Sequence, residues 1–217
     1  MRKLIPPLIV LVAIAASIIV YGNLPASMPT HWSADGDVNG WSSRAFGAFI
    51  VPVMLVFIWA LMRFVPRIDP RGANYAKFGG AFEGMIIAVM LFLLGLHIVV
   101  LRAALGYPVA MERVVPFGVG ALFVVFGTLL PQAQPNWFVG IRTPWTLSSD
   151  VVWQKTHRFG GKVFIVSGVL ILLVSLLSPA FATPVMMTLI LATIGIVLVY
   201  SYREWKHEES LATTVPR

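Results

Sequence analysis

Long apolar segments alternate with short polar connections along almost the whole chain. A transmembrane helix needs about 20 mostly apolar residues, because each residue adds about 1.5 Å and the hydrocarbon core of a bilayer is about 30 Å thick. Six segments meet or approach this requirement, namely 4–22, 45–65, 78–101, 114–131, 163–177 and 183–202. The fifth is the shortest, and we expect its helix to begin before residue 163. The pattern predicts an all-α, polytopic bundle of six transmembrane helices with no large soluble domain.

The composition agrees with this prediction. Of the 217 residues, 58% are hydrophobic and 12% are charged, whereas soluble domains are about 45–50% apolar and about 25% charged. Arg2 and Lys3 precede the first apolar segment, as in a signal peptide, but that segment is as long as a full span and no clear small-residue cleavage site follows it. We therefore expect it to remain as an anchor. The absence of cysteine excludes disulfides, thiolate metal sites, a cysteine nucleophile and lipidation at cysteine.

The basic residues are distributed unevenly between the two sides of the predicted bundle. Thirteen of the sixteen lysines and arginines lie in the termini and the even-numbered connections, and Arg44, Arg102 and Arg113 lie on the other side. Cytoplasmic connections are enriched in such residues, so we predict that both termini face the cytoplasm of a bacterial-type cytoplasmic membrane. The net charge of +7 reflects this asymmetry. It indicates attraction to anionic lipid rather than nucleic-acid binding.

The outer connection, residues 23–44, contains turn-forming residues and two tryptophans. Its proline, glycine, aspartate and asparagine residues favour tight turns, and the tryptophans fit an interfacial aromatic belt. We predict a small folded hairpin that presents His31, Asp35 and Asp37 outward. The candidate site residues here are Pro29, His31, Trp32, Asp35, Gly40 and Trp41. A histidine beside two carboxylates also suits zinc, but local hydrogen bonding by His31 is the favoured alternative, so we predict no metal and no cofactor.

The third apolar segment carries small and ionisable residues. Gly80 and Gly84 form a small-xxx-small pair, which allows another helix to approach closely. Glu83 and His97 are ionisable groups within the apolar stretch, and such groups usually face protein or a water-filled interior. An ion path through both would need relays that the sequence does not clearly provide. The favoured alternative is that a neighbouring helix satisfies each of them.

The inner connection, residues 132–162, is long, polar and aromatic. Pro135 and Pro144 favour extended backbone at the residues before them, and the sequence Ser-Ser-Asp at 148–150 suits a helix start. Val152, Thr156 and Phe159 then fall on one helical face. We predict an extended turn and a short amphipathic helix, with a break or a close contact at the glycine pair 160–161.

This amphipathic helix would lie at the inner membrane surface or fold back under the bundle. We expect its aromatic side chains to anchor at the headgroups and its basic side chains to stay in water. The aromatic set is Trp137, Trp145 and Trp153, and the water-exposed set is Arg142, Lys155, His157 and Arg158. The segment is either a lipid anchor or a docking surface, because aromatic and arginine clusters serve both; the residue types do not favour one over the other.

Two motifs resemble those of the SdpI family. The inner motif comprises Gly140, Ile141, Arg142, Thr143, Pro144, Trp145, Thr146, Trp153, Thr156 and His157. The outer connection is similar to the domain of unknown function that accompanies this family, through Leu24, Pro25, Pro29, His31, Gly36 and Gly40. The resemblance implies a two-span unit, 1–65, and a four-span SdpI-like unit, 66–217.

The resemblance also implies an activity. The type member of the family is an immunity protein that protects its producer from a secreted, membrane-acting toxin peptide and holds a repressor at the membrane. By this resemblance, toxin would meet the outer connection, and a repressor-like protein would meet the inner connection. The partner-binding residues would be Gly140, Arg142, Thr143, Pro144, Trp145, Trp153, Thr156 and His157.

Three function classes therefore compete. The favoured class is a non-catalytic membrane receptor of the immunity and signalling type. The second is a structural or accessory subunit of a larger membrane complex, and the third is a transporter or membrane enzyme. The sequence contains neither a His-Glu-x-x-His run nor a serine elbow, which places the third class last.

Overall fold

Six long helices form the computed structural model of the chain, which describes residues 4–214. They are α1 (Ile5–Val20), α2 (Arg44–Ile68), α3 (Tyr75–Ala104), α4 (Met111–Leu129), α6 (Asp150–Leu177) and α7 (Pro179–Thr214). A short helix, α5 (Pro144–Ser148), and three 3-10 turns complete the helical part: η2 (Tyr21–Asn23), η3 (Gly72–Asn74) and η4 (Leu130–Gln132). All six long helices are long and apolar enough to cross a membrane. The predicted all-α, six-span class is confirmed.

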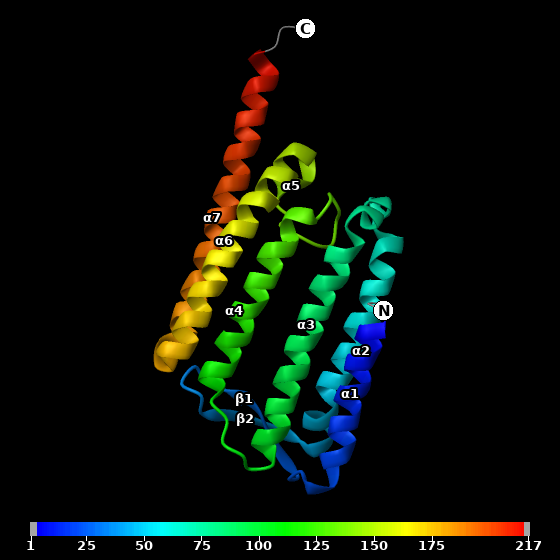
Figure 1. Cartoon of the computed structure of the whole chain (residues 1–217), viewed down its shortest axis with the longest axis vertical. Helices are drawn as coiled ribbons and strands as arrows, with labels where there is room; N and C mark the ends of the chain where they lie inside the picture. Colours follow the sequence, from blue (N-terminus) through cyan, green and yellow to red (C-terminus); the bar gives the residue numbers. More distant parts are fainter. Residues whose placement is uncertain (1–3, 215–217) are drawn as a thin grey trace.

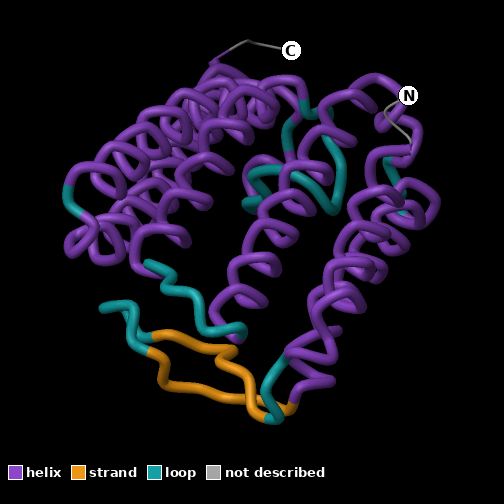
Figure 2. Tube along the Cα trace, turned by 60° about the horizontal axis from the view of Figure 1, so that its bottom comes forward, coloured by secondary structure: helices purple, strands orange, loops and turns teal. Residues whose placement is uncertain are grey.

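The helices form two groups of three. Helices α1, α2 and α3 lie together on one side, and α4, α6 and α7 lie together on the other (Figures 1 and 2). Helices α3 and α4 connect the two groups along the chain and contact each other. We call the end that carries residues 133–149 the loop end, and the opposite end the hairpin end.

The outer connection folds as an antiparallel hairpin, as predicted. Strands β1 (Ser27–Trp32) and β2 (Val38–Ser43) pair Ser27 with Ser43 and Trp32 with Val38, with irregular register around His31. The turn lies beside the second helical group, where the hydroxyl of Thr183 donates to the Ala34 carbonyl at 3.3 Å. The hairpin therefore bridges both groups at this end (Figure 2).

Helix α6 runs without interruption through the glycine pair, so a break at Gly160–Gly161 is wrong. The alternative of a close contact is correct. A Cβ added at Gly161 would lie 2.6 Å from the Gly127 carbonyl oxygen of α4. A Cβ added at Gly127 would lie equally close, 2.6 Å, to the Gly161 carbonyl oxygen. Glycine is about 1 kcal/mol less favourable than alanine inside a helix. The close packing of α4 against α6 compensates for this cost.

The close contact predicted at residues 160–161 extends along α4 and α6, whereas the small-residue pair predicted in α3 meets only a side chain. Gly120 and Gly168 repeat the backbone contact of the Gly127–Gly161 pair seven residues away on each helix. In α3, by contrast, Gly80 is exposed, and a Cβ at Gly84 would meet the Leu129 side chain at 3.1 Å. Small residues on α4 and α6, rather than α3, bring two backbones together.

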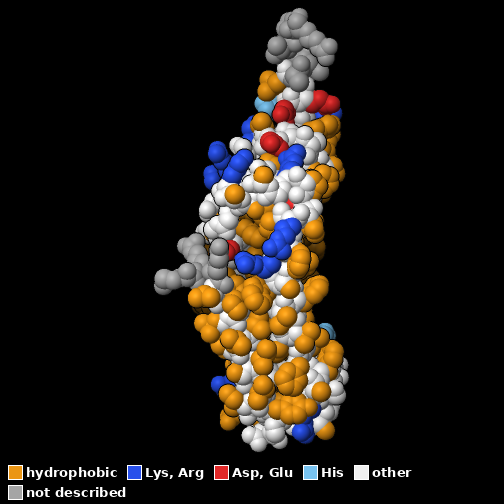
Figure 3. All heavy atoms as spheres, turned by 90° about the vertical axis from the view of Figure 1, so that its right-hand side faces the viewer, with side chains coloured by type: hydrophobic (Ala, Val, Ile, Leu, Met, Phe, Trp, Pro, Cys, Tyr) orange, Lys and Arg blue, Asp and Glu red, His pale blue; other side chains and the backbone are white. Residues whose placement is uncertain are grey.

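A belt of exposed hydrophobic side chains surrounds the bundle. On the face formed by α1 and α2 it includes Leu8, Leu11, Ile19, Val53, Phe57 and Phe64. Figure 3 shows this belt below a region where Lys and Arg side chains gather toward the loop end. Such a belt suits contact with lipid tails, because soluble proteins rarely expose large contiguous apolar surfaces to water.

Candidate functional site

The segment between α4 and α6, residues 133–149, lies at the loop end between the two helical groups (Figure 1). We call it the motif segment, because it carries the first part of the sequence motif. It is folded back onto the bundle. The short amphipathic helix predicted after it does not form a separate element, because its residues are the first turns of the continuous helix α6. Its side chains and backbone make hydrogen bonds to both helical groups.

Asn136 organises the first turn of the motif segment. Its Oδ1 accepts hydrogen bonds from the backbone N–H groups of Phe138 at 2.9 Å and Val139 at 2.7 Å. Its Nδ2 donates to the carbonyl oxygens of Gln134 at 2.9 Å and Val139 at 2.8 Å. The side chain is fully buried. A buried amide with this many partners fixes the backbone around it.

Asp69 and Asn74 fasten this turn to the connection between α2 and α3. The Oδ2 atom of Asp69 accepts from the Tyr75 hydroxyl at 2.8 Å and from the Trp137 N–H at 2.9 Å. Asn74 donates from Nδ2 to the Pro135 carbonyl at 2.7 Å. Asp69 is buried, and its hydrogen bonds compensate for the cost of removing a carboxylate from water. The first helical group therefore holds the start of the motif segment.

Trp153 and His157 hold the motif segment from the side of α6. The indole Nε1 of Trp153 donates to the Ala133 carbonyl at 2.8 Å. The Nδ1 of His157 lies 2.8 Å from the Trp153 carbonyl, and its Nε2 accepts from the Ile141 N–H at 2.9 Å. Because Ile141 supplies the hydrogen, the imidazole is neutral and carries its proton on Nδ1.

Both side chains are completely buried, so the expectation that Trp153 anchors at the headgroups and His157 stays in water is wrong. The periodicity of α6 correctly placed Val152, Thr156 and Phe159 on one face, but the buried face is wider and includes these rings. They stack with centroids 4.1 Å apart. Thr156 is also fully buried, and its Oγ1 has no partner among the described residues.

Gly140 is the one position of the motif segment where only glycine fits. Its φ is +119°, a conformation that side chains of L-residues rarely adopt. A Cβ at Gly140 would also collide with Nε2 of His157 and lie 3.2 Å from the Trp153 ring. The backbone therefore passes directly over the stacked rings and delivers the Ile141 N–H to His157.

Helix α5 fastens the rest of the motif segment to α7. Thr143 caps α5 by a reciprocal arrangement with Thr146, in which each side chain accepts from the other residue's backbone N–H. Thr143 also donates from Oγ1 to Ser201 at 3.2 Å. The Trp145 ring lies 5.1 Å from the Tyr202 ring. Trp145 thus contacts protein with one part of its ring, while the residue as a whole is only half-buried.

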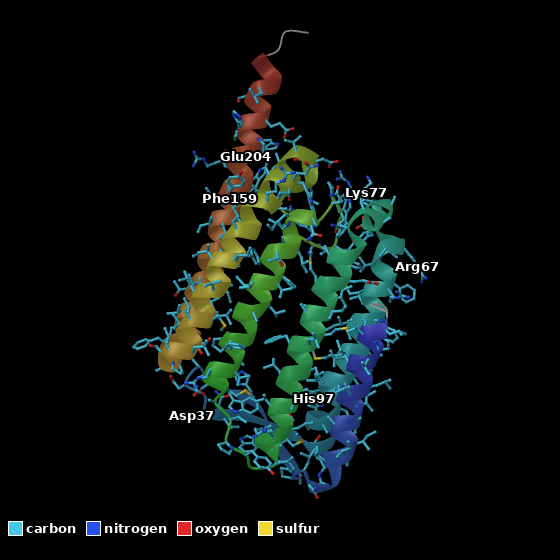
Figure 4. All side chains as sticks on the ribbon, viewed as in Figure 1. Asp37, Arg67, Lys77, His97, Phe159 and Glu204 are labelled. Carbon is cyan, nitrogen blue, oxygen red and sulfur yellow. The ribbon has the colours of Figure 1, made fainter. Side chains whose placement is uncertain are left out.

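Charged side chains at the surface link α6 to both helical groups, through Arg71 before α3 and through Glu204 and Glu208 of α7. Arg71 pairs with Asp150 at 2.7 Å, and Lys155 pairs with Glu204 at 2.8 Å. Glu204 lies on α7 toward the loop end (Figure 4). Ser149 begins α6 by accepting from the Val152 N–H, and donates to Glu208 at 2.6 Å. The predicted helix start at 148–150 is therefore confirmed, with Ser149 as the cap.

The outward-facing part of the motif segment is small. Trp137 is 50% exposed and Phe138 is 38% exposed, and Arg142 and Pro144 are exposed beside them. The guanidinium of Arg142 donates to the Trp137 carbonyl at 2.7 Å. These four residues form what we call the exposed patch. Of the eight residues that the resemblance implied as partner-binding, Arg142 and Pro144 are exposed, Gly140 and Trp145 are half-buried, and Thr143, Trp153, Thr156 and His157 are buried.

At the hairpin end, His31 is exposed and its Nδ1 lies 2.5 Å from Oδ1 of Asn39. No group of three metal-ligating side chains occurs among the described residues, and His31 has the local partner that the favoured alternative proposed. Trp41 is 60% exposed, Trp32 is half-buried and Pro29 is buried. Asp37 lies at the hairpin turn below α4 and α7 (Figure 4).

His97 lies buried near the hairpin end of α3 (Figure 4). Its Nε2 is 2.9 Å from Oγ of Ser17 in α1, and Ser17 donates to the Ala48 carbonyl of α2. A neighbouring helix satisfies this nitrogen, as expected, while Nδ1 of His97 has no partner in the described part of the chain. Glu83 lies far along α3 from His97 and forms no ion pair among the described residues.

An apolar cavity of about 560 Å³ lies between the two helical groups. Its walls include Ile58, Met85, Phe126, Phe164 and Ile190, and Val139, Gly140 and Ile141 close it at the loop end. The motif segment is thus in contact with the interior of the bundle as well as with its surface.

The residues that sequence reasoning missed are Asp69, Asn74, Tyr75 and Asn136. Asp69 and Asn74 lie in the connection between the second and third spans, where the sequence analysis used only the basic residues, to predict the orientation. A signal did exist: short polar side chains next to proline, as in Asp69-Pro70 and Pro135-Asn136, commonly hydrogen-bond to nearby backbone.

Comparisons with known proteins identify the family. Residues 132–202 match the SdpI/YfhL protein family, and residues 8–56 match a domain of unknown function, DUF1648. Immunity protein SdpI of Bacillus subtilis (strain 168) is 31% identical over 205 residues, which cover 94% of this chain and 96% of that protein. No solved structure matches. The chain therefore belongs to the SdpI family of membrane immunity proteins.

Proposed function

We propose that this chain is a non-catalytic, multi-pass protein of the bacterial cytoplasmic membrane that confers immunity to a membrane-acting toxin peptide and relays the toxin's presence to a soluble partner. The similarity to an immunity protein over nearly the full length supports the first part. The observation that carries the second part is the position of the motif segment, which bonds to both helical groups.

The relay rests on that position. The first group holds the motif segment through Asp69, and the second holds it through His157 and Ser201. The hairpin bridges the same two groups at the opposite end. A peptide that changed the spacing of the groups at the hairpin end would therefore strain the motif segment at the loop end, which is how a binding event reaches a distant site.

The partner surface is assigned to the exposed patch. Trp137, Phe138 and Arg142 present two aromatic rings and a guanidinium. All three residue types are enriched in protein interfaces, and tryptophan and arginine dominate binding hot spots. The buried motif residues, such as Trp153 and His157, act in this proposal by positioning the patch rather than by touching a partner. The proposed toxin side is the hairpin, where His31 and Trp41 are exposed.

The orientation that this proposal needs can be tested directly, because the chain has no cysteine. Single variants Asp35→Cys and Ser148→Cys place one thiol at each end, both at exposed positions. In intact cells, a membrane-impermeant maleimide is expected to label Asp35→Cys and to label Ser148→Cys after permeabilisation only. The reverse pattern would place the exposed patch outside the cell and contradict the relay.

Immunity is tested by expressing the chain in Bacillus subtilis cells that lack their own SdpI. The cells are then exposed to the toxin against which the Bacillus subtilis SdpI protects. We expect survival of the cells that express the chain and death of empty-vector cells.

The relay is tested by photo-crosslinking. A photo-crosslinker at Phe138 is expected to capture one soluble protein after toxin exposure, whereas the same group at the exposed Arg203 of α7 is expected to capture none. Stoichiometric capture of integral membrane proteins instead would favour an accessory subunit of a complex.

A further inference from the structure

A second cavity, of about 550 Å³, lies at the loop end of the first helical group, and neither the motif segment nor the hairpin takes part in it. It is lined by Pro6 of α1, by Trp59, Arg63 and Arg67 of α2, and by Gly79 and Glu83 of α3. We call it the arginine pocket. Arg67 extends outward from α2 near this end (Figure 4).

The arginine pocket carries an excess of positive charge. Arg63 and Arg67 are both exposed and one turn apart on α2, and neither belongs to an ion pair among residues 4–214. The Cζ atom of Arg67 lies over the Phe64 ring, 5.6 Å from its centroid. This contact uses the face of the guanidinium, so the N–H donors at its edge stay available. Glu83 is half-buried in the same pocket, so two guanidinium groups stand against one carboxylate.

The depth of these arginines matches the phosphate layer of a bilayer. Arg63 is nineteen residues after Arg44, the first residue of α2, and this distance corresponds to about 28 Å of helix rise. The hydrocarbon core is about 30 Å thick. With the start of α2 at one boundary of the core, Arg63 reaches the other boundary, and Arg67 lies one turn beyond it among the headgroups. In Figure 3, Lys and Arg side chains gather above the hydrophobic belt of this face.

The arginine pocket continues into apolar space. Met62, Phe82 and Ile86 line both this pocket and the apolar cavity between the two helical groups. A ligand with a charged end at Arg63 and Arg67 would therefore find a continuous apolar wall leading from α2 and α3 into the bundle. This combination of a cationic entrance and an apolar interior fits a lipid and does not fit a soluble anion.

We propose that the arginine pocket binds one anionic phospholipid. The phosphodiester is held by Arg63 and Arg67, which suit phosphate because guanidinium donors pair with its oxygens. One acyl chain lies along Met62, Phe82 and Ile86. The carboxylate of Glu83 accepts a hydrogen bond from a headgroup hydroxyl, which a glycerol headgroup supplies. The uncompensated positive charge favours this lipid over a zwitterionic one.

The test uses the full chain in detergent and native mass spectrometry with lipids of matched acyl chains. We expect one phosphatidylglycerol to stay bound and phosphatidylcholine to be retained about tenfold less. Arg63→Gln with Arg67→Gln is expected to remove the preference for phosphatidylglycerol. Gly79→Leu, which adds bulk where a Cβ has free space, is expected to weaken retention of the lipid without changing any charge.

The matched control replaces Arg158 and Lys162, two exposed basic residues one turn apart on α6 outside the pocket. Arg158→Gln with Lys162→Gln is expected to leave phosphatidylglycerol binding unchanged. Equal retention of the two lipids, or an equal loss in the control pair, would overturn the proposal and reduce the effect to a general basic surface. Displacement of the lipid by inorganic phosphate would assign the site to a free anion instead.

Discussion

The Nε2 atom of His157 accepts the backbone N–H of Ile141 at 2.9 Å, across sixteen residues of chain. The same ring donates from Nδ1 to the Trp153 carbonyl one turn earlier on α6. A single neutral imidazole therefore links the motif segment to the helix beneath it. The His157 and Trp153 side chains are fully buried, and Ile141 is half-buried.

Replacing His157 by leucine is expected to destabilise the protein by about 1–3 kcal/mol, because the half-buried Ile141 N–H is left without its acceptor. Unfolding of the purified protein in detergent measures this loss, and limited proteolysis near Phe138 reports whether the motif segment detaches first. His207→Leu, at an exposed position of α7, is the control and is expected to change stability by less than about 0.5 kcal/mol. Similar losses in both variants would mean that the His157 contact is not responsible.

Gly140→Ala is expected to lower stability more than Gly106→Ala. Both glycines have positive φ, +119° and +85°, so both substitutions carry backbone strain of about 1 kcal/mol or more. A Cβ at Gly106 meets nothing within 4 Å, whereas at Gly140 it collides with the His157 ring. The difference between the two variants in unfolding free energy isolates the collision. No difference would show that the motif segment moves aside freely.

Asp69 and Asp150 offer a buried and an exposed carboxylate at the same end of the bundle. Asp69→Ala leaves the N–H groups of Trp137 and Arg71 without the carboxylate that accepts them. The Tyr75 hydroxyl keeps only its longer contact of 3.2 Å with Asn136 Oδ1, so a loss of about 1–3 kcal/mol is expected. Asp150→Ala removes a pair with Arg71 that is largely exposed, which is worth at most about 1 kcal/mol. Equal losses, measured by unfolding in detergent, would contradict the role of Asp69 as the anchor of the motif segment.

The sequence predicted those features of the fold that depend on neighbours in the chain. Six apolar runs of span length gave six helices, and cap-type residues before Val151 placed the start of α6 at Ser149. The turn formers of the outer connection gave the hairpin. Each of these is a local property, set by apolar length, by a side chain that caps its own helix, or by turn geometry.

The parts that were missed or wrong depend on contacts between distant residues. Periodicity gave α6 an apolar face but not its partner, so Trp153 and His157 were placed in the wrong environment. The partner of His157 is a backbone N–H in the motif segment, and Asp69 bonds to a residue 68 positions away. The division into 1–65 and 66–217 and the partner-binding roles of the motif residues stay predictions.

The glycines of α4 and α7 are expected to respond to the same substitution with opposite signs. Gly127→Ala forces apart two backbones, since its Cβ would lie 2.6 Å from the Gly161 carbonyl, and a loss of about 1–3 kcal/mol is expected from overpacking. Gly195→Ala places its Cβ in open space and is expected to be neutral or to stabilise by up to about 1 kcal/mol, because alanine prefers the helix. Unfolding in detergent measures both. A loss at Gly195 as large as at Gly127 would contradict the close contact between α4 and α6.

Ser17 and His97 are expected to show a double-mutant effect at the hairpin end. Ser17→Ala leaves Nε2 of the fully buried His97 without its partner at 2.9 Å, and His97 already has an unpaired Nδ1 within the described chain. The single variant is therefore expected to lose about 1–3 kcal/mol. Adding His97→Leu removes both unpaired nitrogens and replaces the ring by an apolar group of similar size, so the double variant is expected to be more stable than Ser17→Ala alone. Additive losses would indicate that the two side chains act independently, because coupling appears only between residues that share a contact.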